Sequence, residues 1–207
     1  LADATAEQKP GTKYFEDDKD VLTDNAKAEI KASINSTVSW IKSQPNLVPV
    51  KEGAPENGMI ILRGFHVIAT TSQVPTRSWG SGGNKALAVA RKNAIVKYTL
   101  EYVKSIGITI DESDMKVTIG KLGPIGPAWD PKTFSNSERR KPEVQKKYED
   151  TYASSRTASI STVLGFPTFM ESTQPEKEDV GDQLPESNYH YNFHDAKKGG
   201  GKKKNPP

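Results

Sequence analysis

The feature that most constrains the fold is an apolar run, a glycine-rich loop and a long helical pattern that follow one another directly. Residues 59–70, MIILRGFHVIAT, have the β-branched and aromatic content of a strand that is buried on at least one face. The loop SWGSGG at 78–83 leads to Asn84, and a helical pattern then continues to about Ser105, just before the helix-stopping Gly107. This order predicts a strand-loop-helix unit whose loop is built like a ligand cradle.

A second helix is predicted upstream of this unit. Thr23 is suited to cap a helix N-terminus, Asp24 places a favourable negative charge in the first turn, and Pro45 ends the pattern. Apolar residues recur at helical spacing between these points, at Ala26, Ile30, Ile34, Val38 and Ile41. The pattern predicts an amphipathic helix with one buried face.

The second half of the chain adds strands and one short helix. We expect a strand at 115–121, a rigid loop GPIGPAWDP at 123–131, a short helix near 142–152 and a final strand within SSRTASISTVLGF at 154–166. The resulting order, β-α-β-α-β-β, predicts an α+β fold: a two-layer sandwich in which two helices cover one face of a small sheet.

Composition sets the limits of this domain. Hydrophobic residues make up only 34% of the 207 residues, with 16 glycines and 14 prolines, so one core cannot use the whole chain. We expect a linker at 1–13, one domain at 14–166 with insertions at about 45–58 and 130–150, and a low-complexity, disordered tail at 167–207.

Several classes of function are disfavoured. With 29 basic and 26 acidic residues the chain is nearly neutral, which does not indicate a nucleic-acid partner. The absence of cysteine excludes disulfides, thiol catalysis and thiolate metal sites, and the three histidines are scattered. No clustered catalytic set is visible, so we expect no enzyme activity and no cofactor.

Two features near the ends of the chain carry further expectations. His190 and His194 have a spacing that suits a metal on a helix, but the flanking glycines and lysines disfavour a helix there, so no metal site is predicted.

No apolar run is long enough to span a bilayer. Leu1 is not a natural start, so we expect that a membrane anchor, if present, lies in an upstream segment.

Short motifs then appear in a fixed order along residues 14–164. They are F-x-x-D-K-x-x-L at 15–22, N-x-x-L-x-x-x-R at 84–91, Gly107-Ile108 followed by G-x-x-x-P at 120–124, and Ser155-Arg156-Thr157. The set resembles the OmpA-like domain, the peptidoglycan-anchoring module of outer-membrane protein A, of peptidoglycan-associated lipoprotein and of the flagellar stator subunit MotB. The sequence at 69–75, ATTSQVP, is most similar to the G-H-T-D-N-x-P loop of the MotB branch.

The resemblance implies a ligand. In the family, the aspartate of G-H-T-D and the arginine of the second helix hold the ammonium and the carboxylate of diaminopimelate in the peptidoglycan stem peptide. Here Arg91 is present, Ser72 stands in place of the aspartate and Thr70 in place of the histidine. Loss of one partner of a desolvated charge pair costs about 2–5 kcal/mol, so the resemblance implies a weakened or altered site.

The candidate peptidoglycan-binding residues are Arg91, Ser72, Thr70, Thr71, Asn84, Leu87 and Arg156. Each has a simpler structural interpretation beside the functional one. Arg91 could pair with a nearby acid on the surface, Asn84 could cap the helix or stabilise the loop, and Arg156 could pair across the sheet or with a loop carboxylate.

The resemblance therefore implies a non-catalytic, periplasmic module of the cell envelope that anchors or positions a membrane complex, such as a motility stator, at the cell wall. The partners implied are the stem peptide and a second copy of the chain, with membrane contact only through a segment absent from this chain. The alternative is a divergent scaffold that has lost peptidoglycan binding and docks a protein partner through its insertions or tail. The two hypotheses differ in whether Arg91 lies in an open pocket or beneath a loop.

Overall fold

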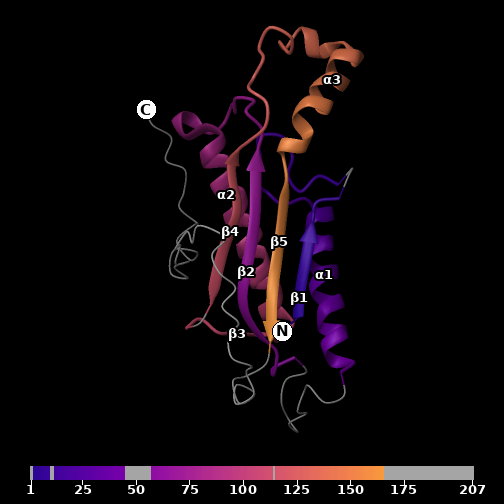
Figure 1. Cartoon of the computed structure of the whole chain (residues 1–207), viewed down its shortest axis with the longest axis vertical. Coiled ribbons are helices and arrows are strands. Elements are labelled where there is room, and N and C mark those ends of the chain that lie inside the picture. Colours follow the sequence, from indigo (N-terminus) through magenta and orange to yellow (C-terminus); the bar gives the residue numbers. More distant parts are fainter. Residues whose placement is uncertain (1, 10–11, 45–56, 114, 166–207) are drawn as a thin grey trace, which may run out of the picture.

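The computed structural model describes residues 2–9, 12–44, 57–113 and 115–165 (Figure 1). The elements, in chain order, are strand β1 (Ala2–Glu7), helix α1 (Asp24–Lys42), strand β2 (Ile61–Thr71), the 3-10 turn η1 (Gly80–Gly82), helix α2 (Gly83–Ser105), strands β3 (Thr109–Ile110) and β4 (Lys116–Pro124), the 3-10 turn η2 (Glu138–Arg140), helix α3 (Pro142–Tyr152), the 3-10 turn η3 (Ala153–Ser155) and strand β5 (Ala158–Gly165). The predicted α+β two-layer architecture is confirmed. The observed order adds two elements to β-α-β-α-β-β: helix α3, which was expected near 142–152, and the short strand β3.

Strand β2 lies at the centre of the sheet. It pairs in antiparallel fashion with β5 on one side and in parallel with β3 and β4 on the other. Strand β1 forms the opposite edge, antiparallel to β5, with Ala2 facing Leu164 and Glu7 facing Ser159. The C-terminal end of β2 therefore lies beside the start of β5 and the end of β4, and this end of the sheet carries the candidate site.

Helices α1 and α2 cover one face of the sheet and share a single core with it. The side chain of Thr23 accepts a hydrogen bond from the backbone N–H of Ala26 at 3.2 Å, as expected for a helix cap. The predicted buried face of α1 is confirmed: Ala26, Ile30, Ile34, Val38 and Ile41.

The buried face of α2 includes polar residues. Thr99 and Arg91 are both buried there, and the Thr99 hydroxyl donates to the carbonyl of Ile95 at 2.8 Å. Because its hydroxyl is satisfied within the helix, Thr99 can lie in the core at little cost. The described residues contain no helix long and apolar enough to cross a membrane.

The N-terminal segment corrects a prediction. Residues 2–7, placed above in a linker at 1–13, form β1 and extend the sheet. Ala4 and Ala6 face the core, while Asp3 and Thr5 are exposed, so the segment does alternate as a strand should. Alanine has low strand propensity, which hid the pattern. Residues 45–56 of the first predicted insertion and the predicted tail at 167–207 lie outside the described residues.

The second predicted insertion, at about 130–150, lies within a compact unit of residues 127–154, which we call the aromatic insertion. Helix α3 occupies the predicted range, with Pro142 at its first position, and lies beyond the end of the sheet (Figure 1). The unit has its own small core, with Phe134, Tyr148 and Tyr152 buried beside Trp129. The Tyr152 hydroxyl donates to the carbonyl of Ala128 at 3.0 Å and accepts from the backbone N–H of Asp130 at 3.1 Å. The insertion thus holds its own shape beside the candidate site.

Candidate functional site

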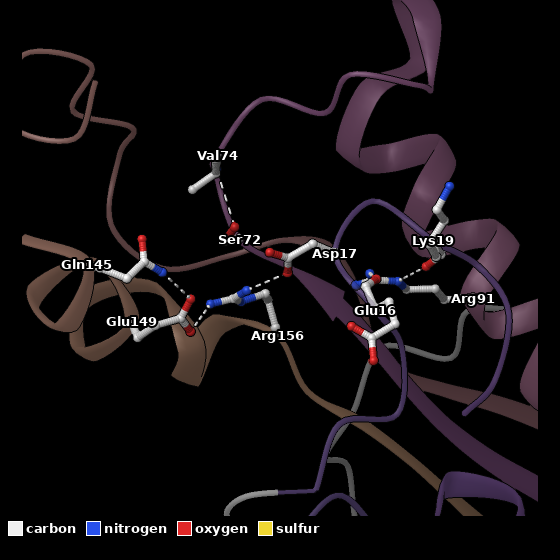
Figure 2. A network of polar contacts seen from close by, with 9 residues as sticks. All are labelled: Glu16, Asp17, Lys19, Ser72, Val74, Arg91, Gln145, Glu149 and Arg156. Atoms are coloured by element: carbon white, nitrogen blue, oxygen red, sulfur yellow. Dashed lines mark hydrogen bonds and ion pairs between the residues drawn. The ribbon is translucent and has the colours of Figure 1, made fainter. Parts of the chain in front are cut away.

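Two hollows open where β2 ends, between the loop before α1 and the aromatic insertion. They have volumes of about 230 and 250 Å³, and Asp17, Arg91 and Arg156 line both of them. Figure 2 shows these side chains converging from separate parts of the chain. The site is therefore assembled from residues far apart in the sequence.

Arg91 lies under the loop that precedes α1. Only 5% of the residue is exposed. Its Nε donates to the carbonyl of Lys19 at 2.9 Å and its Nη2 to that of Glu16 at 3.1 Å (Figure 2). The guanidinium also lies 4.9 Å from the centre of the Phe15 ring. Burial lowers the pKa of Arg91 to about 10, and nearby Asp17 acts in the opposite direction, so the side chain stays charged at neutral pH. Arg91 thus fixes the loop while contributing positive charge to both hollows.

Arg156 joins three segments through two carboxylates. Its Nη1 lies 2.9 Å from Asp17 Oδ1 and its Nη2 lies 2.8 Å from Glu149 Oε2 (Figure 2). The Gln145 side chain donates to the other oxygen of Glu149 at 3.4 Å. These two ion pairs link the loop before α1 and helix α3 to the segment that leads into β5. This is the loop-carboxylate pairing considered above for Arg156, and it places the guanidinium at the wall of both hollows.

Asp18 organises the glycine-rich loop from across the site. Its backbone has a φ of 60°, which is unusual for a residue with a side chain. Its Oδ2 accepts from the backbone N–H of Arg77 at 3.1 Å and of Ser78 at 2.9 Å, and its carbonyl accepts from Trp79 Nε1 at 3.0 Å. The other carboxylate oxygen, Oδ1, is buried without a hydrogen-bond partner among the described residues. Asp18 lines the larger hollow with this acceptor still unused.

The three candidate residues at the end of β2 are buried. The Thr70 hydroxyl donates to the carbonyl of Ser155 at 2.7 Å and also accepts from the backbone N–H of Thr157 at 2.9 Å, so it is engaged in joining β2 to β5. Thr71 donates to the carbonyl of Asn84 at 3.5 Å. Ser72, 6% exposed, accepts from the backbone N–H of Val74 at 3.4 Å (Figure 2). Thr71 and Ser72 line the larger hollow, and Thr70 lines the smaller one.

Asn84 and Leu87 lie at the start of α2 and line the larger hollow. The Asn84 amide donates to the carbonyl of Val74 at 2.7 Å, which matches its interpretation as a loop stabiliser. Leu87 is 3% exposed and supplies an apolar wall. All seven candidate residues therefore lie at one end of the sheet, most of them already bonded within the fold.

The negative charges of the site come from residues that the sequence did not assign to it. Asp17 and Asp18 lie in the acidic run FEDDKD at 15–20, and Glu149 lies on α3. The run was visible in the sequence, but its proximity to Arg91 depends on how the loop before α1 folds over α2. Arg77 and Arg139 also line the larger hollow, and neither was predicted.

Comparison with known proteins adds little to this geometry. No family model matches the chain. No curated protein matches it either. Among solved structures, the chain is similar to the OmpA-like domain of FopA1 from Francisella tularensis subsp. tularensis SCHU S4, with 14% identity over 80% of this chain and 82% of that chain and a TM-score of 0.34. A TM-score this low supports no inference about a ligand, and the fold class rests on the sheet and helices described above.

Proposed function

We propose that this domain is a non-catalytic module of the cell envelope that binds the stem peptide of peptidoglycan at the larger hollow. The ligand group would be a zwitterion such as the free end of diaminopimelate, which presents an ammonium and a carboxylate. Guanidinium groups suit the carboxylate, and a carboxylate of the protein suits the ammonium.

The observation that carries this proposal is that Asp18, whose buried Oδ1 has no hydrogen-bond partner among the described residues, lines the same hollow as Arg91 and Arg156. Ser72 brings no charge to the place where the family has its aspartate. Asp18 and Asp17 supply negative charge to the same hollow from a different loop. The zwitterion site thus has both of its charges, with the acidic partner moved from the end of β2 to the loop before α1.

The wider role follows from the motif resemblance. In this proposal the domain works in the periplasm, as a homodimer, and positions a membrane complex at the cell wall through an anchor outside this chain. A motility stator is one such complex. These statements rest on the resemblance of residues 14–164 to OmpA-like and MotB-like domains.

The test is a titration of the domain with a diaminopimelate-containing muropeptide. Asp18→Asn keeps an oxygen that can accept from the backbone N–H groups of Arg77 and Ser78, but it removes the negative charge. Loss of one partner of a desolvated charge pair costs about 2–5 kcal/mol, so we expect this variant to bind the muropeptide at least tens-fold more weakly. Ser72→Asp should tighten binding, and Lys146→Gln, at an exposed residue of α3 that lines neither hollow, should leave it unchanged. If the parent domain does not bind the muropeptide, the proposal fails.

One observation favours the alternative of a protein-docking scaffold. Arg91 lies beneath the loop at 16–19, and its Nε and Nη2 already donate to backbone carbonyls. That arrangement is expected of an arginine that has become structural. In this alternative the exposed face of the aromatic insertion is the docking surface. Neither the parent domain nor any of the variants above would then bind the muropeptide.

A further inference from the structure

Two arginines beside the larger hollow lie close together, and both donate to one neutral side chain. The Nη2 atoms of Arg77 and Arg139 both donate to Asn136 Oδ1, at 3.5 and 2.7 Å. Both side chains line the hollow. Asn136 is neutral, so one amide oxygen holds two like charges within hydrogen-bond distance of itself. The two guanidinium groups repel each other, and an anion between them would relieve that repulsion.

Asp17 and Asp18 line the same hollow, but neither carboxylate forms an ion pair with these two guanidinium groups. Within the described residues neither Arg77 nor Arg139 has an ion pair with a carboxylate. The acid next to Arg139 in the chain, Glu138, pairs with Lys141 at 2.8 Å instead. Arg139 also has a buried Nε without a hydrogen-bond partner in the described structure, and its guanidinium rests 4.8 Å from the ring centre of Tyr148. Tyr148 thus holds the guanidinium of Arg139 in place beside the hollow.

We infer that Arg77 and Arg139 form a second anion subsite, so that the hollow selects a peptide bearing a carboxylate in addition to the zwitterionic end. The inference rests on the proposed function and names its specificity. In a stem peptide, γ-linked glutamate leaves its α-carboxylate free, and that group is the candidate occupant. Asp18 connects the two subsites, because it accepts from the backbone N–H of Arg77 and lines the same hollow as Arg91 and Arg156.

The structural alternative is that Arg139 only anchors the insertion through Tyr148. That role would need one stacked arginine. It gives no reason for Arg77, from the loop after β2, to meet it on the same oxygen. A second anionic group on the ligand accounts for both.

The experiment compares two muropeptides by calorimetry, identical except that the glutamate α-carboxylate is free in one and amidated in the other. We expect the parent domain to prefer the free carboxylate about tenfold, equivalent to about 1.4 kcal/mol. The double variant Arg77→Gln/Arg139→Gln should lose this preference and still bind the amidated ligand. The matched control Arg140→Gln, which removes the same charge from an exposed neighbour that does not line the hollow, should keep it.

A second variant guards against disruption of the loop. Asn136→Asp is nearly isosteric and places a carboxylate between the two guanidinium groups, so it should also abolish the preference without removing either arginine. Equal affinity of the parent for both ligands, with no effect of these variants, would overturn the second subsite and leave the proposed function intact. Failure of the parent to bind either ligand would overturn both.

Discussion

Arg156 and Asp17 are 139 positions apart in the sequence, and their side chains meet at 2.9 Å. Glu149 completes the group on the opposite side of the guanidinium. Together they hold the loop before α1, helix α3 and the approach to β5 in one place. The walls of the candidate site therefore depend on side-chain contacts between loops more than on any single element.

The first prediction concerns the strength of these contacts. The Asp17 side chain is 73% exposed and that of Glu149 42%, so water screens both pairs. We expect coupling energies of about 0.2–1 kcal/mol for each pair. Double-mutant cycles with Arg156→Gln, Asp17→Asn and Glu149→Gln, followed by urea unfolding, measure them. A coupling well above this range would mean that the group is far less hydrated than its exposure indicates.

Arg91 should matter much more for stability. Arg91→Ala removes two charge-assisted hydrogen bonds to backbone carbonyls and the stacking on Phe15. We expect the free energy of unfolding to fall by about 2–4 kcal/mol. Arg91→Lys should recover only part of it, because a lysine cannot direct donors at both carbonyls in the same plane. The urea midpoint measures the effect, with exposed Arg140→Ala as the control; equal midpoints for the two alanine variants would show that Arg91 is not structural.

The aromatic insertion should respond to acid before the sheet does. Asp130 Oδ1 accepts from the backbone N–H groups of Lys132 and Thr133, each at 3.1 Å. Hydrogen bonds from Thr133 hold the pKa of Asp130 below its ordinary value of 3.8. Its contribution to stability is therefore complete above about pH 4 and is lost as the pH falls through the lower, folded pKa.

Trp129 lies next to Asp130 and reports on this change. In a variant that keeps Trp129 and replaces Trp40 and Trp79 by phenylalanine, the fluorescence should shift at a pH below 3.8 while far-ultraviolet circular dichroism is unchanged. Asp130→Asn, which has no group to titrate there, should remove the transition. A shift that persists in Asp130→Asn would assign the transition to another group.

The insertion should also be removable. Within the described residues, the main core draws on α1, α2 and the sheet and includes no residue of 127–154. Gly126, the residue before the insertion, packs so closely on the side chain of Ser155, the residue after it, that there is no room for a Cβ, and its φ is 84°. The two ends of the insertion are therefore close together. Replacing the insertion by a linker of about four residues should therefore preserve the cooperative unfolding of the sheet and helices. Muropeptide binding should be lost with Glu149, Tyr148 and Arg139. Loss of the fold itself would show that the insertion is part of the core.

The sequence predicted best what depends on local chemistry. Thr23 as a helix cap placed the start of α1 correctly, because capping acts over a few residues. The short helix expected near 142–152 is also present, with Pro142 at its first position. Strand β1 escaped prediction because Ala4 and Ala6 are small enough to be buried yet are poor markers of a strand.

The acidic half of the site could not be predicted in the same way. Asp18 reaches the loop after β2 only because Arg91 holds the segment at 16–19 down on α2. In the sequence, Arg91 is 72 positions from Lys19 and 75 positions from Glu16, so these contacts have no periodic or local signature. The arginines were visible in the sequence, but their acidic partners were set by tertiary structure.

The register of the edge strand has a mechanical consequence. Ala2 lies opposite Leu164, so the start of β1 and the end of β5 lie at the same end of the sheet, while Thr71 and Ser72 lie at the other end. A tether at one end and a captured polymer at the other would pull along the strands. Such a pull strains the hydrogen bonds between β1 and β5 all at once in shear, instead of opening them one after another, and this is the direction in which a sheet resists force best.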